Sequence, residues 1–125
     1  MKRLYAVAHY GLNFDSDGTI EGMDTVGFEY AETWVELMHS HTARTAFPAG
    51  AADAVGVYEI TYPDDLTPER LADLLDEIEW GFNWAHPACV LLFASAGLIR
   101  YNAHQLSRNH PEFVPALKNH GGTTP

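Results

Sequence analysis

The sequence predicts an α+β fold, a two-layer α/β sandwich in which two helices pack on one face of a mixed sheet. Two observations predict this class. Short apolar runs of strand length alternate with segments in which apolar residues recur every three or four positions. The chain has 125 residues, of which 46% are hydrophobic, as in one globular domain. The predicted order of elements is β-α-β-α-β-β.

Residues 4–9 are predicted to form the first strand, because apolar side chains occupy both alternating faces, as in a strand covered on both sides. Residues 27–41 are predicted to form the first helix. Their apolar residues recur at helical spacing, whereas Glu29, Glu32 and Glu36 line another face. This helix would therefore present an ordered row of acids to solvent.

The middle of the chain is predicted to contain a loop, a strand and a helix. Residues 42–53 include proline and glycine and show no sustained period, which indicates a loop. Aromatic and β-branched residues alternate over residues 55–62 and predict the second strand. Thr67 and Pro68 predict the start of the second helix. The threonine hydroxyl can cap free backbone donors, and proline lacks only a donor that the first turn does not use.

The last elements are predicted to form a terminal hairpin. Residues 88–94 are a continuous apolar run of strand length, and residues 98–102 follow across the turn-like segment Ser95-Ala96-Gly97. Residues 105–125 are mostly polar and end in glycine, threonine and proline, which predicts an irregular tail. Residues 1–104 are therefore predicted to form a single globular domain.

The net charge of −10 is concentrated in one part of the chain. Sixteen of the 17 acids lie between Asp15 and Glu79, where only Arg44 and Arg70 offset them, so this segment carries −14 and the remainder +4. Such a field repels nucleic acid and anionic membranes and attracts a basic protein surface at long range. We therefore expect a basic protein partner, and no direct binding of nucleic acid or membrane.

No segment of the sequence reads as a secretory signal or a membrane span, so we expect a cytoplasmic location. The apolar run after Met1 is too short for a secretory signal, and no later stretch approaches the roughly 20 apolar residues that span a bilayer. Cys89 is the single cysteine, so no intramolecular disulfide can form. It lies in an apolar run, where a thiol usually behaves as a small buried side chain.

Residues 13–24 carry oxygen-bearing side chains at alternating positions around Gly18. The pattern resembles the calcium loop of EF-hand proteins. That resemblance implies a Ca²⁺ site with these ligands: Asn13, Asp15, Asp17, the Thr19 carbonyl, Glu21 and Asp24. The loop begins with Asn and ends with Asp, where EF-hands usually have Asp and Glu. The alternative is a β-hairpin or tight loop, because Asp17-Gly18 is a strong turn dipeptide.

Few residues are candidates for a catalytic or transition-metal site. The seven histidines are scattered, and His9, His39 and His86 are those that could converge with acids in the fold. Ser95 lacks the first glycine of a nucleophile elbow, and Cys89 has no basic residue nearby in sequence to lower its pKa. Catalysis is not the favoured class, although a site assembled from distant positions stays open.

The second predicted helix has an apolar stripe on one side and four acids on the other: Glu69, Asp73, Asp76 and Glu77. If this helix continues through Gly81, Trp80 and Trp84 fall among the acids and would serve as exposed anchors for a partner. If Gly81 ends the helix, both tryptophans turn into the core.

These features favour a non-catalytic protein that places its acidic faces and aromatic anchors against a basic site of another protein. A site that normally holds nucleic acid would fit. Small inhibitors from phage and mobile elements, including anti-CRISPR and anti-restriction proteins, often have this size and charge. Two alternatives stay open, a calcium-binding domain that uses residues 13–24 and a small enzyme.

Overall fold

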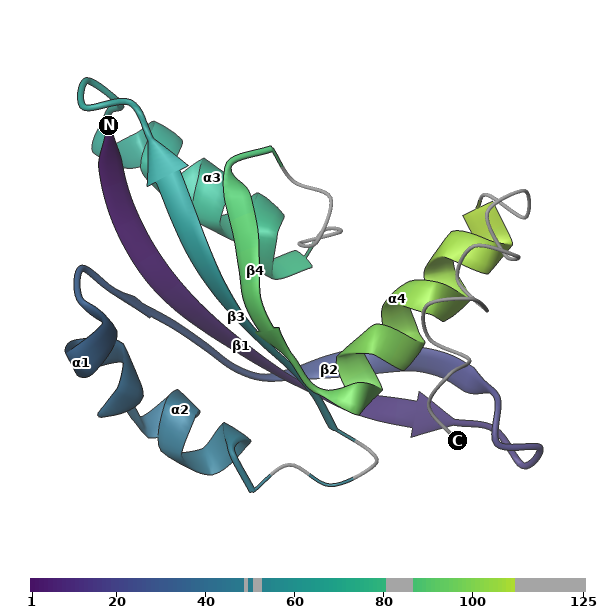
Figure 1. Cartoon of the computed structure of the whole chain (residues 1–125). Coiled ribbons are helices and arrows are strands. Elements are labelled where there is room, and N and C mark those ends of the chain that lie inside the picture. Colours follow the sequence, from purple (N-terminus) through teal and green to yellow (C-terminus); the bar gives the residue numbers. More distant parts are fainter. Residues whose placement is uncertain (49, 51–52, 81–86, 110–125) are drawn as a thin grey trace.

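The computed structural model describes residues 1–48, 50, 53–80 and 87–109 of the chain (Figure 1). The strands are β1 (Lys2–Phe14), β2 (Ile20–Ala31), β3 (Asp53–Tyr62) and β4 (Cys89–Ala94). The helices are α1 (Trp34–Met38), α2 (His41–Ala46), α3 (Pro68–Trp80) and α4 (Ala96–Asn109). The strands form one sheet in the order β2-β1-β3-β4, and each neighbouring pair is antiparallel. The predicted α+β class is confirmed. The order of elements and the antiparallel pairing differ from the predicted β-α-β-α-β-β order and mixed sheet.

Helices cover both faces of the sheet, α1 and α2 on one face and α3 and α4 on the other (Figure 1). The sequence instead predicts both helices on one face. The reason for the difference lies in β1, where Val7 and Ala8 point to opposite faces and are both fully buried. A strand that is apolar on both faces is stable only when other elements pack against each face.

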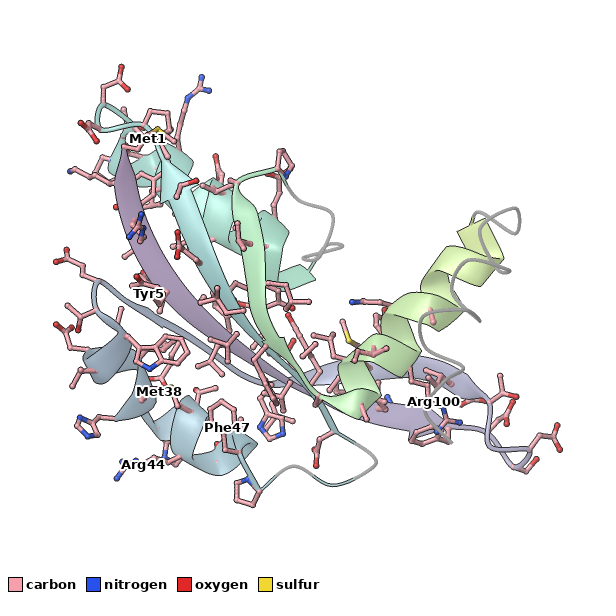
Figure 2. All side chains as sticks on the ribbon, in the orientation of Figure 1. Met1, Tyr5, Met38, Arg44, Phe47 and Arg100 are labelled. Atoms are coloured by element: carbon pink, nitrogen blue, oxygen red, sulfur yellow. The ribbon has the colours of Figure 1, made fainter. Side chains whose placement is uncertain are left out.

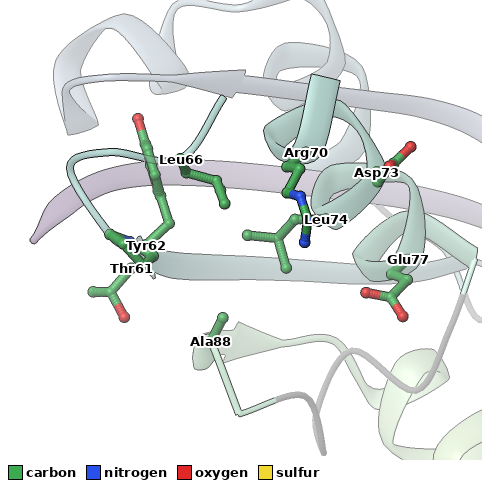
Figure 3. A pocket seen from close by; sticks show the side chains of 9 residues that line it. Thr61, Tyr62, Leu66, Arg70, Asp73, Leu74, Glu77 and Ala88 are labelled. Carbon is green, nitrogen blue, oxygen red and sulfur yellow. The ribbon is translucent and has the colours of Figure 1, made fainter. Parts of the chain in front are cut away.

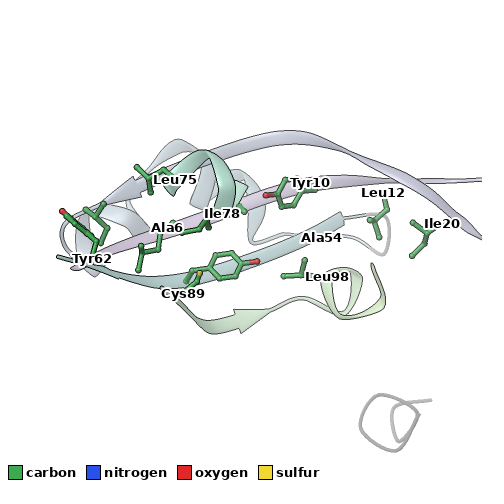
Figure 4. Close-up of a cluster of buried hydrophobic side chains, with 14 residues drawn as sticks. Ala6, Tyr10, Leu12, Ile20, Ala54, Tyr62, Leu75, Ile78, Cys89 and Leu98 are labelled. Atoms are coloured by element: carbon green, nitrogen blue, oxygen red, sulfur yellow. The ribbon is translucent and has the colours of Figure 1, made fainter. Parts of the chain in front are cut away.

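The larger core lies between the sheet and helices α3 and α4 (Figure 4). Leu75 and Ile78 of α3 and Leu98 of α4 pack there against buried aromatic side chains of the sheet, including Tyr10 and Tyr58. A smaller cluster on the opposite face joins α1 and α2 to the sheet through these residues: Val7, Leu37, Ala43, Ala46, Val55 and Val57.

Residues 27–41 do not form the single helix that the sequence predicts. The segment 20–31 is strand β2, which runs back along β1 from Phe14 opposite Ile20 to Tyr5 opposite Ala31. Helix α1 begins only after its N-cap Thr33, whose hydroxyl accepts a hydrogen bond from the Glu36 N–H at 3.2 Å. Pairing with β1 satisfies the backbone groups of β2 that face β1, and the β-branched and aromatic residues of β2 suit a strand.

Part of the predicted loop over residues 42–53 is helical, because α2 occupies residues 41–46. Two side chains bind free N–H groups of its first turn. The Ser40 hydroxyl accepts from the Ala43 N–H at 3.2 Å, and the Glu29 carboxylate accepts from the Thr42 N–H at 2.6 Å. The helix also lies close to β2, since a Cβ at Gly27 would fall 2.8 Å from the Thr42 hydroxyl oxygen.

The predicted terminal hairpin is wrong after β4, because residues 96–109 form α4. The Ser95 hydroxyl caps this helix by accepting from the Leu98 N–H at 3.3 Å, and it also accepts from the Val55 N–H of β3 at 2.8 Å. The helix includes residues 105–109 of the predicted irregular tail. Residues 110–125 lie outside the described residues.

Other predicted elements are confirmed. β1 contains residues 4–9, β3 contains residues 55–62, and β4 covers residues 89–94 of the predicted strand 88–94. Helix α3 begins as predicted, since the Thr67 hydroxyl accepts from the Arg70 N–H at 3.3 Å. These segments share strong local signals, either alternating apolar residues or a capping pair.

The two edges of the sheet differ in chemistry. β2, at one edge, contains three acids, Glu21, Asp24 and Glu29, whereas β4, at the other edge, contains no charged residue. The tip of the β1–β2 hairpin is held to α4 by Arg100 (Figure 2). Its guanidinium donates to the Gly18 carbonyl at 3.1 Å and lies 5.1 Å from the centre of the Phe14 ring.

Candidate functional site

The outer face of α3 is an acidic surface formed by Glu69, Asp73, Asp76 and Glu77. All four side chains are exposed, while Leu75 and Ile78 on the opposite side of the helix are buried in the core. The predicted division of this helix into an acidic and an apolar side is therefore confirmed. Burial and the neighbouring Asp76 carboxylate both raise the pKa of Glu79, which follows on the same helix.

A groove of about 620 Å³ adjoins this acidic surface, between α3 and the end of β3 (Figure 3). Tyr62, Leu66 and Leu74 supply apolar lining, and Asp73 and Glu77 supply carboxylates. Arg70 also lines the groove. The acidic surface of α3 therefore includes a hollow whose walls are partly apolar and partly charged.

The predicted acidic row of Glu29, Glu32 and Glu36 does not exist, because the three residues belong to different elements. Glu29 lies in β2, Glu32 follows that strand, and Glu36 lies in the first turn of α1. Hydrogen bonds from the Thr42 side chain and backbone, with a weaker one from Ser40, lower the pKa of Glu29. Glu29 therefore stabilises the start of α2.

The predicted tryptophan anchors cannot be placed against the acidic surface. Trp80 is the last residue of α3, and its side chain lies outside the described residues, as does the whole of Trp84. Their contribution to partner binding stays a prediction.

The segment 13–24 forms a β-hairpin, as the alternative interpretation predicts. Oδ1 of Asp15 accepts hydrogen bonds from the N–H groups of Asp17 and Thr19, both at 2.9 Å, and Gly18 has φ of +79°. The Thr19 carbonyl accepts from the Asp15 N–H at 2.9 Å, so two of the predicted ligand oxygens also maintain the turn.

Of the other predicted calcium ligands, Asp17 is exposed in the turn, whereas Asn13, Glu21 and Asp24 lie along the hairpin strands. Asn13 donates from its amide to the Asp24 carboxylate at 3.1 Å, and Glu21 is exposed on β2. Among the described residues, no three or more His, Cys, Asp or Glu side chains are grouped so that they could hold a metal ion. Calcium binding by this segment stays a prediction.

The structure brings together His9 and Asp53, a pair that no pattern in the sequence connects. Nε2 of His9 lies 3.1 Å from Oδ1 of Asp53, and the His9 side chain is only 8% exposed. Because a carboxylate only accepts, Nε2 donates, and Nδ1 has no hydrogen-bond partner within the described part of the chain. The two residues are 44 positions apart and meet through the β1–β3 register, for which neither residue carries a local signal.

This pair has a structural explanation. Hydrogen bonds from the Gly50 N–H and from His9 lower the pKa of Asp53, so the carboxylate connects the turn before β3 to the centre of the sheet. Ser95 lies close by, but its hydroxyl binds the backbone of Val55 and Leu98. Within the described residues, no hydroxyl or thiol is bonded to His9 as a nucleophile would be.

The other candidate nucleophile and histidines also lack a catalytic arrangement in the described residues. Burial raises the pKa of the Cys89 thiol to about 12, so the thiolate is disfavoured. His39 follows α1 as its C-cap and is exposed, away from His9 in the core, and His86 lies outside the described residues.

Comparisons of the chain with protein-family models, with curated proteins and with solved structures give no match. No helix in the described part of the chain is long and apolar enough to cross a membrane.

Proposed function

We propose that this chain is a non-catalytic binding protein whose acidic α3 surface and adjoining groove hold a basic segment of a partner protein. The observation that carries the proposal is the placement of four exposed carboxylates of α3 beside a partly apolar groove. Such a combination suits lysine and arginine side chains, which have an apolar stem and a cationic head.

The lining suggests how a basic side chain would sit. Its stem would lie against Leu66 and Leu74, and its head would meet the carboxylates of Asp73 and Glu77. Arg70 in the same groove repels cations, so the partner's charges are expected on the side of the groove where the acids lie. The net charge of −10 would add long-range attraction at low salt.

The finer form of the proposal is an inhibitor that acts in the cytoplasm and occupies a nucleic-acid-binding site of its partner, as small inhibitors from phage and mobile elements do. It is supported by the −14 charge of residues 15–79, because the carboxylates of this segment would compete with the phosphates of nucleic acid for a basic surface. This form requires that the partner's nucleic acid and the α3 surface exclude each other.

The proposal is tested by fluorescence anisotropy with a labelled peptide that alternates lysine and leucine. The wild-type chain should bind this peptide and lose affinity as NaCl rises. Asp73→Asn with Glu77→Gln should weaken binding about fivefold or more, equivalent to ~1 kcal/mol. The matched control is Asp17→Asn with Glu21→Gln, which removes the same charge from exposed positions of the distant hairpin.

Equal weakening by the α3 pair and the hairpin pair would contradict the proposal, because it would show attraction by net charge alone. A binding site on α3 predicts little change in the hairpin pair. A second arm adds a single-stranded oligonucleotide to a complex of the chain with a basic nucleic-acid-binding protein. Displacement of the chain supports the finer form, and simultaneous binding contradicts it.

A further inference from the structure

Strand β4 presents an uncharged apolar edge. Its four central residues are all exposed, Val90 by 56%, Leu91 by 38%, Leu92 by 44% and Phe93 by 45%. Phe93 also contacts the 42% exposed Phe47 at the end of α2, with ring centres 5.7 Å apart. Within the described sheet, β4 pairs only with β3, so its other side is an edge.

An edge of this kind is unusual for a protein that stays monomeric. Edge strands are commonly protected from pairing by charged side chains, proline or β-bulges. β4 has no charged residue and no proline, and its register shift against β3 is confined to Leu92. β2, at the opposite edge, has three acids. Four consecutive exposed apolar residues on an unpaired edge are the features expected of a strand that pairs with another strand.

We propose that β4 binds a second copy of this chain, with the two β4 strands antiparallel and related by a two-fold axis. The strand is self-complementary, because its sequence Cys-Val-Leu-Leu-Phe-Ala places apolar against apolar residues in any antiparallel alignment with its own copy. A basic partner would find no carboxylate on this strand. The acidic surface on α3 therefore does not compete with a copy for the β4 edge.

The area of the edge is consistent with a dimer of modest affinity. The exposed parts of the four β4 side chains and Phe47 amount to roughly 400 Å² per copy, about half of the ~800 Å² per partner that stable interfaces bury. Backbone pairing along the strand supplies further contact. We therefore expect dimerisation in the micromolar range, about 10⁻⁶ to 10⁻⁵ M.

Salt distinguishes this dimer from the binding proposed for α3. Each copy carries −10, so the copies repel each other at low ionic strength, and salt should strengthen their association. Binding of a basic segment to α3 should instead weaken with salt. Either proposal can therefore fail while the other stands.

The test is sedimentation velocity of the full chain from about 1 to 500 µM, a range that spans the expected affinity, in low and high NaCl. The expected result is a shift from the monomer mass of 13.9 kDa to twice that mass, at lower concentration in high salt. Leu92→Lys should weaken dimerisation at least tenfold. Ile99→Lys is the matched control, because Ile99 is 52% exposed on α4, outside the strand, and should leave dimerisation unchanged.

Val90→Thr provides a milder variant if Leu92→Lys fails to fold, and it should weaken the dimer while keeping a β-branched residue in the strand. Hydrogen exchange of the wild-type chain gives an independent measurement, since those amides of Val90–Phe93 that point away from β3 should exchange more slowly as concentration rises. A monomer at every concentration would overturn the proposal. So would protection of these amides that does not depend on concentration, because the occupant would then belong to the same chain.

Discussion

At the scale of single residues, the most consequential contact joins Asp53 to His9 and to the Gly50 N–H. Both hydrogen bonds stabilise the ionised carboxylate and lower its pKa, so ionised Asp53 stabilises the folded state. A group with a lowered folded-state pKa contributes stability that is complete above its unfolded pKa and is lost as the pH falls through the folded value.

Asp53→Asn should therefore lower the free energy of unfolding at neutral pH, and the difference from wild type should shrink as the pH falls below about 4. Urea unfolding between neutral and acidic pH measures this difference. The matched control is Asp65→Asn at an exposed position before α3, which should cost little at any pH. A difference for Asp53→Asn that is constant across this pH range would contradict the expectation.

Cys89 gives a second expectation for a single residue. Cys89 is only 9% exposed, and burial raises the pKa of its thiol to about 12, so a thiol reagent that requires the thiolate should react slowly with the folded chain. In urea the same reagent should react at the rate of a free cysteine. Fast labelling of the native protein would show that β4 opens readily.

At the scale of elements, α4 depends on the absence of a side chain at Gly97. A Cβ there would lie 1.9 Å from the Asp53 carbonyl oxygen, a distance that backbone atoms cannot accommodate without movement. At an exposed position within a helix, alanine normally stabilises the helix by about 1 kcal/mol relative to glycine. At this position the close approach to β3 should reverse that preference.

Overpacking by the added methyl group should lower the free energy of unfolding by about 1 to 3 kcal/mol. Gly97→Ala is therefore expected to lower the melting temperature by several degrees. Gly22→Ala is the control, since a Cβ at Gly22 meets nothing within 4 Å. Circular dichroism melts compare the two variants with wild type. An unchanged or raised melting temperature for Gly97→Ala would mean that α4 does not pack on β3 in this way.

Local signals explain which elements the sequence predicts correctly. β3 is buried continuously over residues 54–58 and alternates between apolar and polar residues from Tyr58 to Tyr62, and Thr67-Pro68 defines the start of α3 without help from the rest of the fold. β2 is different, because Phe28 and Ala31 are three positions apart, which fits one face of a helix, whereas in the strand they lie on opposite faces and pack against different clusters. Its partner β1 decides between them, and pairing partners are not visible in a single segment.

The candidate site is also predicted only where a local signal exists. The acids of α3 follow from the helical period alone, and their exposure is as expected. Glu29 is misassigned because it lies in β2 and its carboxylate binds the Thr42 N–H of α2, which follows in the chain only after α1. The His9–Asp53 pair depends on register between distant strands, and the α3 groove depends on how α3 lies against β3.

At the scale of the whole molecule, the concentration of charge has a direct consequence for stability. Residues 15–79 carry −14, and unscreened repulsion among these acids opposes the compact state. Raising NaCl from about 20 to 300 mM should raise the melting temperature by a few degrees. Differential scanning fluorimetry at low protein concentration measures this effect without a contribution from dimerisation.

The variant Asp73→Asn with Glu77→Gln provides the comparison for this experiment. It carries two fewer negative charges and should show a smaller salt-dependent rise than the wild type. A melting temperature that falls with salt would indicate that attractive ion pairs, such as Arg3 with Glu59, outweigh the repulsion.

The contrast between the two sheet edges limits how far assembly can proceed. A sheet whose two edge strands can both pair with further copies can assemble without limit and form a fibre. In this chain the acids of β2 oppose addition at one edge, while β4 accepts a copy at the other. Once two β4 strands have paired, both outer edges of the joined sheet are β2 strands. Growth should therefore terminate at a pair, and filaments should be absent even at high protein concentration.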